Sequence, residues 1–159
     1  MNQDRPAFRL MNEIGIIDQL GKAALEAVLP DGLTVPQFII LNHFVRLGGQ
    51  RSPSELARAF QVTKGTMTST LQRLEAKRFI EILSDPEDGR GKRVRITAAG
   101  IAARERSIQK LQPVLDMIDQ AIGREAIQSL LPVLTQLRIH LDAARDVDGR
   151  VLPATAEPL

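Results

Sequence analysis

The feature that most constrains the fold is a pair of helix-start signals placed close together in residues 52–63. Ser52-Pro53-Ser54-Glu55 sets a capping serine three residues before a glutamate, with proline at the first helical position. Thr63 offers a second N-cap at the end of the turn Gln61-Val62-Thr63. The first helix must therefore be short and end near Phe60, and a second helix must begin almost at once. We expect two helices joined by a tight turn and set at a steep angle.

The second helix of this pair, KGTMTSTLQRLEAKRF, is expected to be amphipathic. Met67, Leu71 and Leu74 form an apolar stripe, and Phe60 and Val62 are expected to close the turn beneath it. The opposite face shows small or polar residues and no acidic residue before Glu75. Such a face can approach a polyanion closely and bond to base edges or phosphates. Two helices arranged in this way project the second one into the major groove of DNA.

A β-hairpin is expected after the helix pair. Residues 80–82 and 94–96 alternate apolar and charged side chains, so their apolar side chains can face the core while Arg93 and Arg95 face outward. The loop between them, about eight to ten residues long, is expected to be flexible and to carry Arg90 between two glycines. We expect Asp88 to pair with Arg90 and to direct it into a narrow minor groove. The alternative is a charged, solvated hairpin tip.

Helices are expected on both sides of this segment. They cover residues 8–29, 35–47, 98 to about 122, and 124 to about 145. The helix at 35–47 is nearly apolar on all sides and is expected to lie at the centre of the core. Pro113 and Pro132 are expected to kink or interrupt the last two helices locally. Residues 147–159 are rich in Pro, Gly and Ala, and we expect a poorly ordered tail.

The last two helices carry long apolar stripes, from Leu111 to Ile118 and from Ile127 to Leu141. These stripes hold more apolar surface than one small domain can cover, which predicts a homodimer. The alternative is that they pack on the first helix of the same chain.

Composition excludes several classes of function. The chain has no cysteine, so disulfides, thiolate metal sites and thiol redox sensing are excluded. Its two histidines lack metal-binding spacing, and no glycine-rich phosphate loop follows a strand, so we expect no metal, no cofactor and no enzyme activity. Residues 51–100 hold ten Lys/Arg against six Asp/Glu, which favours a polyanionic partner. No leader or membrane span is recognisable, so a cytoplasmic location without membrane contact is expected.

Residues 54–97 resemble the winged helix-turn-helix of the multiple-antibiotic-resistance-regulator (MarR) family. The family's wing pattern, D-x-R-x-x-x-(V/L)-x-(L/I)-T, is met by Asp88, Arg90, Val94, Ile96 and Thr97, and its R-L-E is met by Arg73-Leu74-Glu75. Gly89 departs from the family, which often has Arg or Lys there. The resemblance implies a mainly α fold with a small β-hairpin wing. The winged helix-turn-helix would span residues 33–97, between dimerisation helices in residues 1–32 and 98–146.

The implied function is that of a sequence-specific DNA-binding transcriptional regulator. It would act as a homodimeric repressor on a palindromic operator in double-stranded DNA, released by a small-molecule effector. A winged-helix module that binds protein instead of DNA is the alternative. His43 and Arg46 are the candidate ligand residues, although His43 can equally be a core histidine. The expected DNA contacts are Lys64, Gly65, Thr66, Thr68, Ser69, Gln72 and Arg73 on the recognition helix, and Asp88, Arg90, Lys92, Arg93 and Arg95 on the wing.

Overall fold

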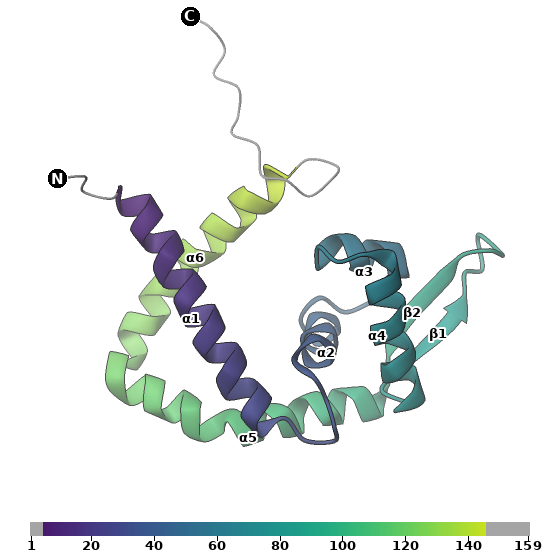
Figure 1. Ribbon diagram of the computed structural model, residues 1–159, viewed down its shortest axis with the longest axis horizontal. Coiled ribbons are helices and arrows are strands. Elements are labelled where there is room, and N and C mark those ends of the chain that lie inside the picture. Colours follow the sequence, from purple (N-terminus) through teal and green to yellow (C-terminus); the bar gives the residue numbers. More distant parts are fainter. Residues whose placement is uncertain (1–4, 146–159) are drawn as a thin grey trace, which may run out of the picture.

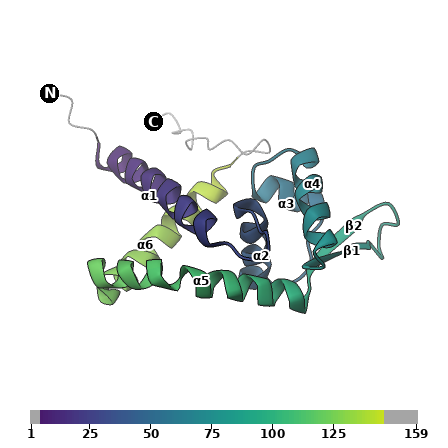
Figure 2. The same ribbon diagram turned by 60° about the horizontal axis from the view of Figure 1, so that its bottom comes forward.

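The computed structural model describes residues 5–145, which form six helices and one hairpin. In chain order these are α1 (Pro6–Val28), α2 (Val35–Leu47), α3 (Pro53–Ala59), α4 (Lys64–Ala76), β1 (Ile80–Ser84), β2 (Lys92–Ile96), α5 (Ala98–Ile122) and α6 (Arg124–Ala143). Helices α2, α3 and α4 and the hairpin gather at one end of α5, and α1 and α6 lie toward its other end (Figures 1 and 2). The mainly α fold with a small β-hairpin is confirmed.

The hydrophobic core lies in the lobe built from α2, α3, α4 and the hairpin. Helix α2 is central to it, as expected, with Ile40, Leu41 and Phe44 almost completely buried. The other members are Leu33, Leu56, Ala57, Met67, Leu71, Leu74, Phe79, Ile80, Val94 and Ala103. Because Ala103 belongs to α5, the long helix takes part in this core and holds the lobe at its N-terminal end.

The hairpin forms with the predicted orientation of its side chains. Ile80 pairs with Ile96 and Ile82 with Val94 in an antiparallel register, and Ile80 and Val94 are buried. Ile82 and Ile96 are partly buried against the same core. The strands extend further than expected, to Ser84 and from Lys92, so the connecting loop is limited to residues 85–91.

The two long C-terminal helices continue through their prolines. Pro113 lies inside α5 and Pro132 inside α6, and neither interrupts its helix. A proline inside a helix frees the carbonyl four residues earlier. Here those carbonyls belong to Gln109 and Gln128, which are both exposed, so water can satisfy them. The expected tail at 147–159 falls outside the described residues.

Within residues 5–145, no helix is long and apolar enough to cross a membrane.

Candidate nucleic-acid interface

Each helix of the helix-turn-helix begins with a local cap. The Ser52 hydroxyl accepts a hydrogen bond from the Glu55 N–H at 3.2 Å, and the Glu55 carboxylate accepts one from the Ser52 N–H at 2.6 Å. Thr63 caps α4 by accepting from the Thr66 N–H at 3.1 Å. These contacts confirm both predicted helix starts.

The turn between α3 and α4 is closed by its backbone. Gln61 has a φ of 54°, in the left-handed region, where non-glycine residues are uncommon. This conformation lets the Val62 N–H reach the Ala57 carbonyl at 3.0 Å and the Gln61 N–H reach that of Arg58 at 3.3 Å. Both bonds satisfy carbonyls at the end of α3. Phe60 packs against the core as expected, whereas Val62 is exposed because the turn carries it away from the α4 stripe.

Helix α4 divides into a buried and an exposed face as the sequence predicted. Met67, Leu71 and Leu74 are buried against the core. The seven predicted recognition residues, Lys64, Gly65, Thr66, Thr68, Ser69, Gln72 and Arg73, are all exposed. The first turn of α4 contains no acidic residue, so nothing there repels an approaching phosphate. The Thr66 hydroxyl lies 2.9 Å from that of Thr63, so it takes part in the helix cap.

The C-terminal end of α4 is anchored by contacts that the sequence did not predict. The Lys77 ammonium donates to the carbonyls of Asp31 at 2.8 Å and Gly32 at 2.6 Å, in the turn between α1 and α2. Arg106 on α5 donates to the Asp31 carboxylate at 2.7 Å. The recognition helix is therefore linked to the α1–α2 turn and, through Asp31, to α5.

The wing has a third strand-like neighbour that the sequence also did not predict. Arg51, between α2 and α3, exchanges two backbone hydrogen bonds with Val94, at 3.1 and 2.8 Å. This bridge fastens β2 to the helix-turn-helix at one point.

The wing tip is closed by internal hydrogen bonds that the sequence did not predict. The Asp85 N–H donates to the Gly91 carbonyl at 3.0 Å, and the Gly91 N–H donates to the Asp88 carbonyl at 2.7 Å. A Cβ at Gly91 would lie 2.9 Å from that of Asp85, so the tip has no room for a side chain there.

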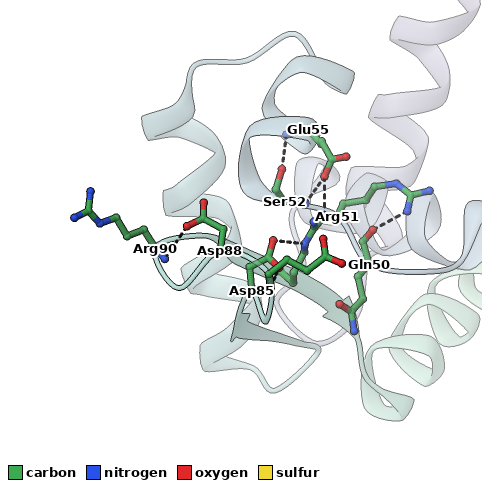
Figure 3. A network of polar contacts seen from close by, with 9 residues as sticks. Gln50, Arg51, Ser52, Glu55, Asp85, Asp88 and Arg90 are labelled. Carbon is green, nitrogen blue, oxygen red and sulfur yellow. Dashed lines mark hydrogen bonds and ion pairs between the residues drawn. The ribbon is translucent and has the colours of Figure 1, made fainter.

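The predicted ion pair between Asp88 and Arg90 does not form. Instead, the Asp88 carboxylate accepts a hydrogen bond from the Arg90 backbone N–H at 3.1 Å. The Arg90 side chain extends away from the rest of the network (Figure 3). The short Asp88 side chain closes a local turn onto the nearest N–H, as aspartate commonly does. It therefore shapes the tip and leaves the guanidinium free.

The four wing cations fall into two groups. Arg93 pairs with Asp85, with Nε and Oδ2 2.7 Å apart, and Arg95 pairs with Glu81 at 2.8 Å. Arg90 and Lys92 are exposed and form no ion pair within the part of the chain that the structure describes. Arg90 and Lys92 are therefore the wing cations that can bind DNA without first breaking an ion pair.

The carboxylates around Arg93 are stabilised in their charged form. The backbone N–H of Glu87 lowers the pKa of Asp85 most, and Arg93 lowers it further. The backbone and hydroxyl of Ser52 lower the pKa of Glu55, with a smaller contribution from Arg93. These carboxylates stay ionised at neutral pH.

The two candidate ligand residues lie at the end of α2. His43 is half-buried, with its ring edge-on to Phe44 and to Phe60, at centroid distances of 6.1 and 5.1 Å. Burial lowers the pKa of His43, and the nearby Arg46 and Arg51 lower it further. Arg46 is exposed. Within residues 5–145, no three His, Asp or Glu side chains gather into a potential metal site.

Comparison with known proteins identifies the family. The MarR family model matches residues 31–91. The multiple antibiotic resistance protein MarR of Escherichia coli is 30% identical over 110 residues, which cover 69% of this chain and 68% of that protein. Its counterpart in Salmonella typhimurium is 37% identical over 81 residues, 51% of this chain and 56% of that protein.

Solved structures agree in fold over most of both chains. The apo form of E. coli MarR aligns with a TM-score of 0.69 and 28% identity, covering 86% of this chain and 98% of that one. A mutant of E. coli MarR in complex with operator DNA aligns with a TM-score of 0.67 and 26% identity, covering 86% and 99%. The resemblance read from the recognition helix and wing is thus confirmed: the chain belongs to the MarR family and is a DNA-binding transcriptional regulator.

Proposed function

We propose that the protein is a homodimeric repressor that binds a palindromic operator and leaves it when a small molecule binds. The observation that carries the proposal is the exposed face of α4, polar and free of acids in its first turn, beside a wing that extends the Arg90 guanidinium outward. Each α4 would enter a major groove, and each wing would reach a neighbouring minor groove. The proposed winged helix-turn-helix spans residues 33–97, with dimerisation helices in residues 1–32 and 98–146.

The homodimer is supported by apolar side chains that the described chain leaves exposed. Helix α6 has no buried residue, although Leu130, Leu131 and Val133 are apolar. On α1, Ile17 and Leu20 are 64% and 65% exposed. Helix α1 touches α5, but contact within one chain leaves these side chains uncovered. A second copy that covered them would remove apolar surface from water on both helices at once.

The exposed residues of α4 divide by chemistry. Thr68 and Gln72 can bond to base edges, so we assign them to sequence readout. Lys64, Ser69 and Arg73 suit phosphate contacts, and Gly65 allows the helix to approach the DNA backbone closely. On the wing, Arg90 is assigned to the minor groove and Lys92 to phosphate. A partner protein would be recognised by an apolar or acidic face, which α4 lacks, so the protein-binding alternative is disfavoured.

The effector part of the proposal rests on His43 and Arg46 at the end of α2. A half-buried imidazole between aromatic rings, next to an exposed guanidinium, suits an anionic ligand with an apolar body. Because the proposed site of action is chromosomal DNA, the proposed location is the cytoplasm. The proposal includes no enzymatic step and no cofactor.

The decisive experiment first identifies a binding site: the purified protein is mixed with genomic DNA fragments from its source organism, and the fragments that it enriches are sequenced. Binding of the enriched site is followed by fluorescence anisotropy over a range of salt concentrations. We expect Arg90→Ala to weaken binding by about 1–3 kcal/mol and to lower the salt slope by about one unit per wing. If this variant bound as tightly as wild type, with the same salt slope, the wing would have no role in DNA binding and would be only a solvated loop.

Two further measurements test the remaining parts. Light scattering should give about twice the chain mass of 17.5 kDa at micromolar concentration, and a single-chain mass would refute the dimer. Thr68→Ala and Gln72→Ala should cost about 1–3 kcal/mol on the enriched site and little on random DNA. An equal loss on both DNAs would show that they only position the helix.

A further inference from the structure

The wing is attached to the helix-turn-helix through both strands. On β1, the Ile82 N–H donates to the Glu75 carboxylate of α4 at 3.2 Å. On β2 there are two attachments. One is the backbone bridge between Arg51 and Val94. The other is the side chain of the preceding residue, Arg93, which reaches across to α3. The backbone bridge, the Ile82–Glu75 bond and the buried Ile80 and Val94 all hold the base of the hairpin. A small rotation at the base moves the tip by a larger distance. The second attachment on β2, nearer the tip, restricts that rotation and so the direction in which the tip points.

Arg93 makes this second attachment through two carboxylates from different elements. Its Nε lies 2.7 Å from Asp85 Oδ2, where the tip begins, and its Nη1 lies 3.7 Å from Glu55 Oε2 on α3. In Figure 3, Glu55 and Asp85 belong to the same network of polar contacts. The Arg93 side chain is only 32% exposed, so much of its surface is already covered.

We propose that Arg93 is a positioning residue, which clamps the wing onto α3 through Glu55 and so aims Arg90 at the DNA. The inference rests on the proposed role of the wing in operator binding. Arg93 was expected from the sequence to meet phosphate, but its Nε donates to Asp85 and its Nη1 forms an ion pair with Glu55, so two acids of the same chain already offset its charge. A guanidinium has several donors in a fixed fork, which suits it to bridging two carboxylates at once.

Arg95 provides an internal contrast. Its partner is Glu81, which lies directly opposite it in the strand register. That pair stays inside the hairpin and links the wing to nothing else. The Arg93–Glu55 and Arg95–Glu81 pairs each bring one acid and one arginine close to the proposed DNA surface, but only the Glu55 pair links the wing to a helix.

The proposal predicts that removing an acidic residue near the DNA weakens binding, which is the opposite of the usual effect. Removing a negative charge beside DNA should tighten binding, because repulsion of phosphates is lost. If Glu55 holds the wing in place, its loss should weaken binding instead. Glu55→Gln suits this test, because the glutamine oxygen can still accept the Ser52 N–H and preserve the α3 cap.

The test compares Glu55→Gln, Arg93→Met and the control Glu81→Gln on the enriched operator. We expect Glu55→Gln to bind about two- to fivefold more weakly, the range of a half-exposed ion pair. Arg93→Met should weaken binding at least as much, and the double variant should be no weaker than Arg93→Met alone. Glu81→Gln should bind as tightly as wild type or more tightly. Glu55→Gln binding at wild-type strength or above would overturn the proposal.

A second readout needs no DNA and so separates the clamp from the proposed function. The chain contains no cysteine, so Gly89→Cys and Arg58→Cys provide the only two sites for spin labels. Added atoms at Gly89 meet nothing within 4 Å, and Arg58 on α3 is exposed. Labelled protein is diluted with unlabelled chain, so that distances within one chain dominate.

We expect a narrow distance distribution in wild type and in Glu81→Gln, and a broader one in Glu55→Gln and Arg93→Met. All variants should unfold at the wild-type temperature, since the pair is near the surface. Identical distributions in all four proteins would show that Arg93 does not fix the wing. If wild type binds no DNA, the function proposed above fails, and the distance distributions still decide whether the clamp exists.

Discussion

Gly100 lies in the first turn of α5, against the backbone at the base of the wing. A Cβ at this position would lie 2.0 Å from the Phe79 carbonyl oxygen and 2.8 Å from Cγ1 of Ile96. Phe79 is buried, and its carbonyl also accepts the Thr97 N–H at 3.1 Å. Gly100→Ala therefore has two opposing effects on stability: a gain in helix propensity and a steric clash with Phe79 and Ile96.

The magnitudes decide the sign. Helix propensity alone favours alanine over glycine by about 1 kcal/mol inside a helix. Against this, the Phe79 backbone must move by roughly 1.5 Å to reach an ordinary van der Waals separation. Overpacking of this kind costs about 1–3 kcal/mol, and loss of the Thr97 hydrogen bond adds about 0.5–1.5 kcal/mol. We expect a net loss of about 2 kcal/mol in the free energy of unfolding.

Urea and thermal unfolding at one fixed protein concentration provide the measurement, because association of chains changes the apparent stability. A loss of about 2 kcal/mol corresponds to a decrease in Tm of about 4–8 °C for a chain of this size. Gly65→Ala is the matched control. It also lies in a first helical turn, but its added Cβ would meet only the Thr63 hydroxyl, at 3.9 Å. We expect this control to be at least as stable as wild type.

A Gly100→Ala protein as stable as wild type would refute the reasoning. It would mean that the backbone where α4, the wing and α5 meet can shift to accept a methyl group with no loss in the free energy of unfolding.

Three further predictions follow from local geometry. Arg78 has a φ of 59° just after α4, and we expect Arg78→Gly to raise the free energy of unfolding by about 0.5–1 kcal/mol, measured in urea; a loss of stability would show that the Arg78 side chain matters more than its backbone. Lys77→Met removes the donor to the Asp31 and Gly32 carbonyls, and we expect a loss of about 1 kcal/mol in the same assay, whereas no loss would mean that water replaces the ammonium fully. For His43, burial and two nearby arginines lower the folded pKa below 6.5, so the folded state binds fewer protons than the unfolded state just below that pH. Stability should therefore fall as the pH drops below about 6.5 and level off beneath the folded pKa, and His43→Gln should show a smaller decrease in Tm between about pH 7.5 and about pH 5.5. An unchanged decrease would assign the effect to other groups.

Most secondary structure could be predicted because its causes lie within a few residues of each other. Ser52 and Glu55, and likewise Thr63 and Thr66, form their caps across one helical turn. The same holds for Thr97, which accepts the Gly100 N–H at 3.0 Å. Apolar spacing then predicted the buried stripe of α4 and the inward side of the hairpin, because each has a fixed period.

The free and paired cations of the wing could not be separated in the same way. The sequence placed Arg90 at the tip and Arg93 and Arg95 on the outward face of the hairpin, but it could not show which of the four cations are paired with acids. Their distinction depends on which carboxylates the fold brings near, and Glu55 comes from another element, α3. Asp88, the acid nearest to Arg90 in the pattern, bonds instead to its backbone N–H, because that donor is closer.

The sequence by itself thus determined which segments form helices and strands, which faces they bury and which family the chain resembles. Tertiary structure alone decided the Arg51–Val94 bridge, the clamp at Arg93 and the contact of Lys77 with a turn 46 residues away. The physical reason is range. Capping and periodicity act along the chain within one or two turns, whereas ion pairs and backbone bridges require groups that only the packed core brings together. Gly100 shows the same limit, since helix propensity favours alanine there, whereas Phe79 and Ile96, which pack against it from outside α5, exclude a side chain.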